Sequence, residues 1–277
     1  MKSIILCADD YGQNAAISQA IITLLKKKKL SATSCMATMP HWLAQAGWLA
    51  PLKDQADIGV HFNLTQGNPL SSEWKAAHGT TFPSLSVLLR QCYWRQLNKA
   101  AILAELHAQL DQFIVGVGRM PDFIDGHQHV HQFPVIRDLF LTLYHERLRP
   151  NACYVRCVYD PMTWLRVTEE AYIKRSVIQL CGASTFKRQL MRRNIPHNSS
   201  FSGIYHFAHA ANYAKLFLRF LQHSVEGGLI MCHPGLASTQ ESDEIADSRP
   251  QEYQYFESEQ FLMDCHQNQV IISRFAC

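Results

Sequence analysis

The sequence predicts an α/β fold arranged as a (β/α) barrel, and two observations lead to this prediction. Short, continuously apolar segments alternate with longer segments in which apolar residues recur at helical spacing. This alternation is typical of parallel strands covered by helices. Polar residues also stand at or just after the ends of several apolar segments, and a (β/α) barrel builds its active site at that edge. We expect residues 1–277 to form one catalytic barrel domain.

The individual elements follow from the same patterns. Apolar segments predict strands over residues 3–8, 31–39, 58–64, 122–125, 153–158, 203–207, 228–232 and 270–275. Periodic segments predict a helix after Asn14, a capping residue type, and further helices over 41–49, 100–114, 135–148, 168–193, 212–223 and 251–266. Residues 66–83 contain turn residues without clear periodicity, so we expect a long loop that faces the substrate.

Composition excludes several classes of function. The net charge is only +3 and the basic residues form no patch, so we expect no nucleic-acid partner. The longest apolar runs fall well short of the ~20 residues that cross a bilayer, so we expect no stable membrane insertion. Nine cysteines occur without a Cys-x-x-Cys pair, which fits a reducing compartment. Acidic residues appear too early for a signal peptide, and we expect a soluble, cytoplasmic protein.

A cluster of metal-binding residue types follows the predicted strand 122–125. Asp125, His127, His129 and His131 stand two residues apart, and in an extended chain such residues share one face. Their nitrogen and oxygen donors suit zinc or a similar divalent ion. The alternative interpretation is a histidine-rich surface loop without a function.

Polar residues at the other strand ends extend this cluster. Asp9 and Asp10, His61, Arg156 and His233 each lie at or near the end of a predicted strand. Taken singly, they are explained as a helix cap, a core histidine or a strand-ending turn. Arg156 is harder to explain in this way because a charged residue in a buried strand needs a partner. Side chains from five strand ends therefore predict one shared site.

The chemistry of this set predicts a metal-dependent hydrolase. Asp10, His61 and His127 would each supply one ligand, and a metal held there would acidify a bound water that attacks a polarised carbonyl. Asp9 is then the expected general base and His233 the expected acid. Arg156 would keep the Asp9 carboxylate ionised and oriented.

The motifs in this order resemble the YdjC-like family of chitooligosaccharide deacetylases. Matching segments are residues 8–12 (ADDYG), 59–65 (GVHFNLT) and 125–131 (DGHQHVH), with 154–156 (YVR) and 233–235 (HPG) in support. The resemblance implies a variant barrel related to the polysaccharide deacetylases. It also implies removal of an N-acetyl group from an acetylated amino sugar or short oligosaccharide by a magnesium or zinc enzyme. A lipid-linked sugar is a further substrate that relatives suggest.

By position, the resemblance assigns Asp10, His61 and His127 as metal ligands, Asp9 as the base and His233 as the acid. The assignments of Asp9 and Asp10 could be reversed. Asp125, His129 and His131 remain candidates either for contact with the substrate or for orienting a metal-ligating histidine through its other ring nitrogen.

Two other functions remain open at this stage. A metal-dependent phosphoesterase on the same barrel would use His129 and His131 for a second metal. A non-catalytic sugar-binding protein would retain the barrel without the reaction. The expected partner is a small amino sugar or oligosaccharide, and a homodimer is compatible with the sequence.

Overall fold

The computed structural model describes residues 1–159, 179–207, 212–238 and 243–276. These residues contain one sheet of eight strands, and every strand pair in it is parallel. The strands are β1 (Lys2–Tyr11), β2 (Ala32–Cys35), β3 (Asp57–Phe62), β4 (Phe123–Gly126), β5 (Tyr154–Val155), β6 (Phe201–Ser202), β7 (Gly228–Cys232) and β8 (Val270–Ile272). Their order is β5-β4-β3-β2-β1-β7-β6, and β8 pairs with the first residues of β1.

The sheet curls until its two edge strands are joined by an irregular segment. The main-chain N–H of Val155 in β5 donates to the carbonyl of Pro196, and Val155 forms a parallel bridge with His197. Asn198 then bonds the main chain of Cys157 through both ends of its side-chain amide. Because this segment runs directly into β6, the barrel closes without a regular strand pair. The predicted (β/α) barrel, in its variant form, is confirmed.

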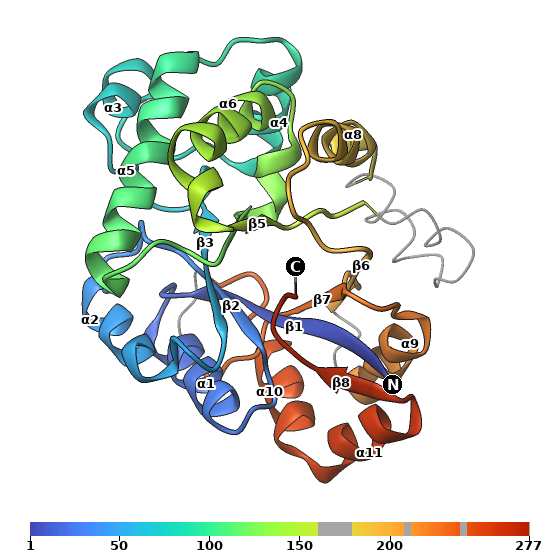
Figure 1. Cartoon of the computed structure of the whole chain (residues 1–277). Coiled ribbons are helices and arrows are strands. Elements are labelled where there is room, and N and C mark those ends of the chain that lie inside the picture. Colours follow the sequence, from blue (N-terminus) through green and yellow to red (C-terminus); the bar gives the residue numbers. More distant parts are fainter. Residues whose placement is uncertain (160–178, 208–211, 239–242, 277) are drawn as a thin grey trace.

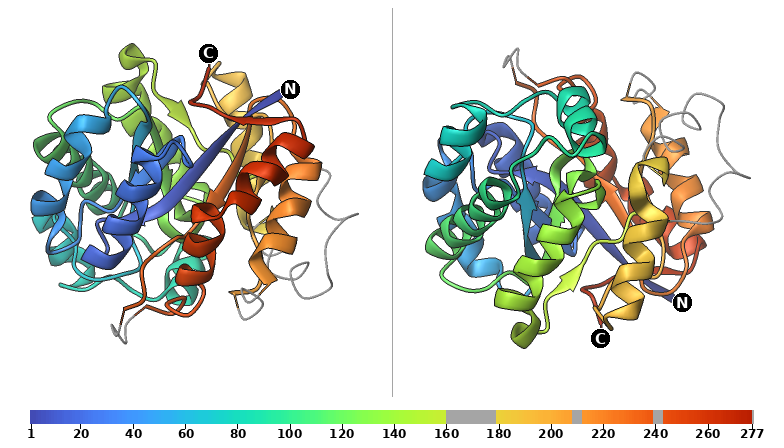
Figure 2. Two further views of the ribbon diagram at one scale, coloured as in Figure 1. Left: turned by 90° about the horizontal axis from the view of Figure 1, so that it is seen from below. Right: turned by 90° about the horizontal axis from the view of Figure 1, so that it is seen from above.

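Helices cover the outside of the curled sheet (Figures 1 and 2). The α-helices are α1 (Ala15–Lys26), α2 (Trp42–Ala46), α3 (Ser72–His78), α4 (Leu85–Tyr93), α5 (Lys99–Val117), α6 (Ile136–Leu143), α8 (Ser184–Arg192), α9 (Tyr213–His223), α10 (Arg249–Glu257) and α11 (Glu259–Gln267). Shorter helical turns are η1 (Gly47–Leu52), η2 (His127–Gln132), η3 (Tyr144–Leu148), η4 (Arg149–Asn151) and η6 (Gln179–Ala183). Asn14 caps α1 by accepting from the N–H of Ile17, as its position predicted.

Several predicted elements need correction. The expected loop 66–83 contains α3, which Ser71 caps and whose Trp74 is fully buried. The expected helix 251–266 is two helices separated at Ser258. The expected strand 203–207 is wrong, because β6 lies just before it and the left-handed Gly203 (φ 104°) follows. The predicted helix 168–193 falls partly on residues 160–178, outside the described residues, and α8 accounts for its last turns.

The end of the barrel opposite the polar strand ends is closed by the last residues of the chain. The ring of Phe275 stacks on Tyr154 at a centroid distance of 4.1 Å, and Arg274 Nε donates to Asp57 Oδ1 over 2.7 Å. Tyr154 and Asp57 are the first residues of β5 and β3. In the described part of the chain, no helix is long and apolar enough to cross a membrane.

Candidate active site

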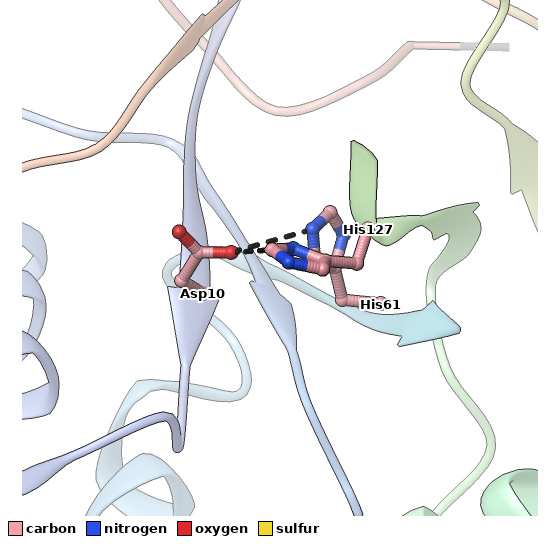
Figure 3. A group of neighbouring side chains, drawn as sticks. All are labelled: Asp10, His61 and His127. Carbon is pink, nitrogen blue, oxygen red and sulfur yellow. Dashed lines mark hydrogen bonds and ion pairs between the residues drawn. The ribbon is translucent and has the colours of Figure 1, made fainter. Parts of the chain in front are cut away.

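Asp10, His61 and His127 converge at the carboxyl ends of β1, β3 and β4 (Figure 3). Asp10 Oδ1 lies 3.1 Å from His127 Nδ1 and 3.6 Å from His61 Nε2. The three donor atoms all lie within 4.8 Å of one another. Asp10 and His61 are buried and His127 is half-buried. One carboxylate oxygen and two imidazole nitrogens at this spacing form a donor set suited to a divalent metal.

An irregularity in β1 gives Asp10 an unusual backbone. The register between β1 and β2 shifts between Ala8 and Tyr11, and Asp10 has a left-handed φ of 67°. Such bulges occur beside active sites, where they redirect a side chain. Burial by itself would raise the pKa of Asp10, but Arg249 and His127 hold that pKa well below its usual value. The group is therefore a carboxylate, and its second oxygen accepts from Arg249 Nη2 over 2.8 Å.

His61 is oriented from behind by Asp125. Asp125 Oδ1 lies 2.6 Å from His61 Nδ1 and accepts from the Ser34 hydroxyl over 2.5 Å. Burial opposes ionisation of Asp125, yet the neighbouring Arg156 and His61 lower its pKa below the usual value. A carboxylate bonded to one imidazole nitrogen leaves the other nitrogen available as a metal ligand, which is the usual arrangement behind metal-bound histidines. Here that nitrogen is the one turned toward Asp10.

Asp9 is held by a fully buried guanidinium. Arg156 Nη1 donates to Asp9 Oδ2 over 2.6 Å, and Nη2 donates to Asp9 Oδ1 over 2.5 Å. Arg156 Nη2 also forms an ion pair of 2.8 Å with Asp125 Oδ2. One cation thus bridges two buried carboxylates, and this bidentate geometry both orients Asp9 and compensates its burial.

Two groups of side chains in the described residues could hold a metal, and one fits better. The second group consists of Asp9, His61 and Asp125. In that group every carboxylate oxygen already contacts Arg156, His61 or Ser34, and the guanidinium would repel a second cation. In the first group, the contacts of Asp10 Oδ1 within the described residues are to imidazole nitrogens of His61 and His127. The donor set of Asp10, His61 and His127 therefore fits a divalent ion.

His233 lies across the site, directly after β7. Its main-chain N–H donates to Glu252 Oε2 over 2.6 Å, and its ring contacts Phe207 at a centroid distance of 5.4 Å. The other oxygen of Glu252 accepts from the Tyr205 hydroxyl over 2.6 Å. Burial raises the pKa of Glu252 to about 7.

These side chains border a cleft of about 650 Å³ at the carboxyl ends of the strands. Asp9, Asp10, His61, His127 and His233 all line it. Further walls come from loops and strands around the barrel, among them Thr65, Gln66, Leu85, Ile204, Phe207 and Met231. A volume of this size accommodates a small ligand with a mixed polar and apolar surface.

The prediction that His129 and His131 share a face with His127 is wrong. Residues 127–132 form the turn η2, in which Gln128 (φ 51°) and His129 (φ 60°) are left-handed. His131 is buried against Phe140 and Phe186, and its Nε2 lies 3.2 Å from the Arg156 carbonyl. Burial lowers the pKa of His131 to about 4, so it is a neutral core residue. His129 lines the cleft.

Three charged residues of the site had no recognisable signal in the sequence. Arg249 bonds Asp10, Asp243 accepts from Arg249 Nε over 2.6 Å, and Glu252 binds the main chain of His233. All three lie near or in α10, where Arg249 precedes a proline at the start of the helix. Charged residues at a helix start are ordinarily exposed, and only the tertiary contacts distinguish these.

The curled parallel sheet, its outer helices and the polar carboxyl edge define a variant (β/α) barrel with a polar cleft at the carboxyl ends of its strands. Within this class, the chain belongs to the family of YdjC-like proteins, whose model matches residues 3–267.

Individual relatives share less of their length. A chitooligosaccharide deacetylase from Yersinia enterocolitica is 30% identical over 153 residues, which are 54% of this chain and 58% of that protein. A carbohydrate deacetylase from Danio rerio is 30% identical over 146 residues, 50% of this chain and 44% of that protein. The matches thus span about half the length of these curated relatives.

Two solved structures show the same fold. A protein from Enterococcus faecalis V583, provisionally described as a cellobiose-phosphate cleavage protein, superposes with a TM-score of 0.76 at 20% identity and covers 99% of this chain and 97% of its own. A family 4 carbohydrate esterase from Streptomyces lividans, solved with acetate, has a TM-score of 0.50 at 8% identity, covering 98% and 91%.

Proposed function

We propose that this protein is a metal-dependent carbohydrate N-deacetylase. It hydrolyses the N-acetyl group of an acetylated amino sugar or short oligosaccharide. The observation that carries the proposal is the convergence of Asp10, His61 and His127 beside the Asp9–Arg156 pair, in the wall of a cleft that His233 also lines. Membership of the YdjC-like family and the names of its curated relatives support it.

Asp10, His61 and His127 are the residues that would hold a divalent ion, zinc or magnesium. When bound, such an ion supplies Lewis acidity toward the amide carbonyl and acidifies water. Asp10 rather than Asp9 is the better ligand because both oxygens of Asp9 accept from Arg156. Asp125 keeps His61 turned toward this set.

Asp9 serves as the general base in the proposed reaction. Asp9 Oδ1 accepts from both Arg156 and the Cys7 thiol, whereas Oδ2 accepts one hydrogen bond from Arg156 and retains a lone pair, and Asp9 lines the cleft. Water adds to the acetyl carbon and gives a proton to Asp9, and the amide C–N bond then breaks. His233 gives a proton to the departing nitrogen. The products are acetate and the free amino sugar.

His129 and His131 have separate roles in this proposal. His129 belongs to the cleft wall and is the candidate for contact with the substrate. His131 supports the main chain at Arg156. In the described residues neither joins a group of potential metal ligands, which favours a deacetylase over a two-metal phosphoesterase.

The test is release of acetate from N-acetylglucosamine oligomers by the zinc-loaded or magnesium-loaded protein. We expect turnover by the wild type and losses of about 100-fold or more in Asp9→Asn and in His127→Ala. His107→Ala is the matched control, because His107 lies on α5 and pairs with Glu146 outside the cleft. Phosphate release from phosphoesters without acetate release would refute the proposal. Sugar binding without turnover would instead support a binding protein.

A further inference from the structure

Helix α10 places two buried charged side chains, one turn apart, beside the candidate site. Arg249 is 2% exposed and Glu252 is 0% exposed. Arg249 bonds Asp10, on the metal-binding side of the cleft, and Glu252 bonds the main chain of His233 on the other side. Residues three apart lie on the same face of a helix, so a single rigid element contacts both groups.

The turn formed by residues 233–235 is docked on the first turn of α10. The N–H of His233 donates to Glu252, and the N–H of Gly235 donates to the Arg249 carbonyl over 3.2 Å. Between them, Pro234 restricts the backbone. Gly235 permits a close approach, because an added Cβ would lie 3.0 Å from Arg249 Cβ. The main chain on both sides of Pro234 is thereby fixed relative to α10.

Glu252 accepts hydrogen bonds from the His233 N–H and the Tyr205 hydroxyl, and Tyr213 of α9 also lies against its carboxyl group. Tyr205 and His233 both line the cleft. Two of the hydrogen-bond partners of Glu252 thus belong to the wall of the cleft that carries the expected acid.

We infer that Glu252 is a positioning residue that sets His233 against the leaving nitrogen by holding its main-chain N–H. The inference rests on the proposed deacetylase function. A hydrogen-bond acceptor at position 252 is the requirement, and the negative charge is not. Because α10 also holds Asp10 through Arg249, this helix fixes the distance between the expected ligand set and the expected acid.

The experiment compares Glu252→Gln with Glu252→Met in the full chain, assayed for acetate release. Gln retains an acceptor for the His233 N–H, so we expect kcat within about threefold of wild type. Met has a similar length but no strong acceptor, so we expect kcat to fall about 100-fold while KM changes little. Tyr255→Phe is the control, because it removes another buried hydrogen bond of α10, to Asp264, that faces away from the cleft. It should leave kcat unchanged.

A second pair of variants tests the docking without altering Glu252. Gly235→Ala should push the turn from α10 and lower kcat about tenfold. Gly47→Ala, where an added Cβ meets nothing within 4 Å, should have no effect. If Glu252→Met does not fold, the comparison of Gly235→Ala with Gly47→Ala still tests the inference. Equal losses of kcat in Glu252→Gln and Glu252→Met would overturn the inference, because the charge would then be essential. Full activity in both Glu252→Met and Gly235→Ala would also overturn it.

Hydrogen exchange of the His233 amide separates this inference from the proposed function. We expect slow exchange in the wild type and Glu252→Gln, and exchange at least about tenfold faster in Glu252→Met. If the wild type releases no acetate from any sugar, the proposed function fails, and the exchange rates still decide whether Glu252 fixes His233. Unchanged exchange in Glu252→Met would refute the positioning role even in an active enzyme.

Discussion

At the scale of single residues, Asp10 combines a left-handed backbone with a charged side chain that contacts both the histidines and an arginine. Its backbone is left-handed, with φ 67°, inside a strand. Its carboxylate faces His61 and His127 on one side and Arg249 on the other. Asp and Asn tolerate the left-handed region better than other residues with a Cβ, so the backbone and the chemistry select the same residue type.

Comparing Asp10→Asn with Asp10→Ala separates these two features. Both variants remove the charge that pairs with Arg249, but only Ala also adds backbone strain. We therefore expect the free energy of unfolding of Asp10→Ala to be about 1–2 kcal/mol lower than that of Asp10→Asn. Zinc affinity should fall about 100-fold in both. Urea unfolding and zinc titration calorimetry measure the two effects. Equal stability of the two variants would show that the left-handed backbone carries no strain.

The sequence predicted those site residues that interrupt apolar segments. Asp9, Asp10, His61, Arg156 and His233 follow this pattern, and the structure brings them to one edge of the barrel. The spacing of His129 and His131 was misleading because it holds only for an extended chain. The backbone turns at Gln128 and His129, which are both left-handed. Neither Gln nor His is a residue type from which a left-handed backbone would be predicted.

At the scale of elements, the strands were predicted better than the helices. The segment 228–232 matches β7 residue for residue, because a buried parallel strand is continuously apolar. Helix α3 was missed since Trp74 is its only buried side chain. Its start depends on Glu105 of α5, which accepts from the N–H groups of Leu70 and Ser71. This contact between distant segments has no local signal.

The break between α10 and α11 is a local event that hydrophobic periodicity does not reveal. Ser258 is extended, with φ −73° and ψ 158°, and its hydroxyl accepts from the N–H of Phe261 to cap α11. The break lets α10 pack between α1 and α9 while α11 packs beside β8. The helix that carries Arg249 and Glu252 is thus short and held on both sides.

Glu252 gives this element a pH-dependent stability. Its pKa rises from 4.5 to about 7 on burial, with Tyr205, Tyr213, His233 and Arg249 opposing the rise. The folded state therefore binds more protons than the unfolded state between these pH values, and stability contributed by Glu252 is lost as pH rises through about 7. A difference of about 2.5 pKa units corresponds to about 3 kcal/mol.

Glu252→Gln removes this titration. We expect the free energy of unfolding of the variant, relative to wild type, to increase by up to about 3 kcal/mol between pH 5 and pH 8. Denaturant unfolding of both proteins at the two pH values measures it. Tyr255→Phe should show no such relative change. A constant difference between Glu252→Gln and wild type would mean that Glu252 keeps an ordinary pKa in the folded protein.

At the scale of the whole molecule, the two ends of the barrel differ in structure and in proposed role. The carboxyl ends of the strands carry the candidate site, and the amino ends are closed by β8 and the tail that follows it. The sequence predicted a strand over 270–275, but β8 stops at Ile272. Arg274 and Phe275 then turn onto β3 and β5, a packing that depends on partners more than a hundred residues away.

This separation predicts that the tail stabilises the barrel without affecting the site. Phe275→Ala removes a half-buried ring stacked on Tyr154, which should lower the free energy of unfolding by about 2 kcal/mol. Ile271→Ala is the matched control, because Ile271 lies on β8 but is 46% exposed, and it should cost less than about 1 kcal/mol. Zinc affinity should stay at the wild-type value in both variants. Denaturant unfolding and zinc titration provide the readouts, and weaker zinc binding by Phe275→Ala would show that packing at the amino end reaches the ligand set through β3.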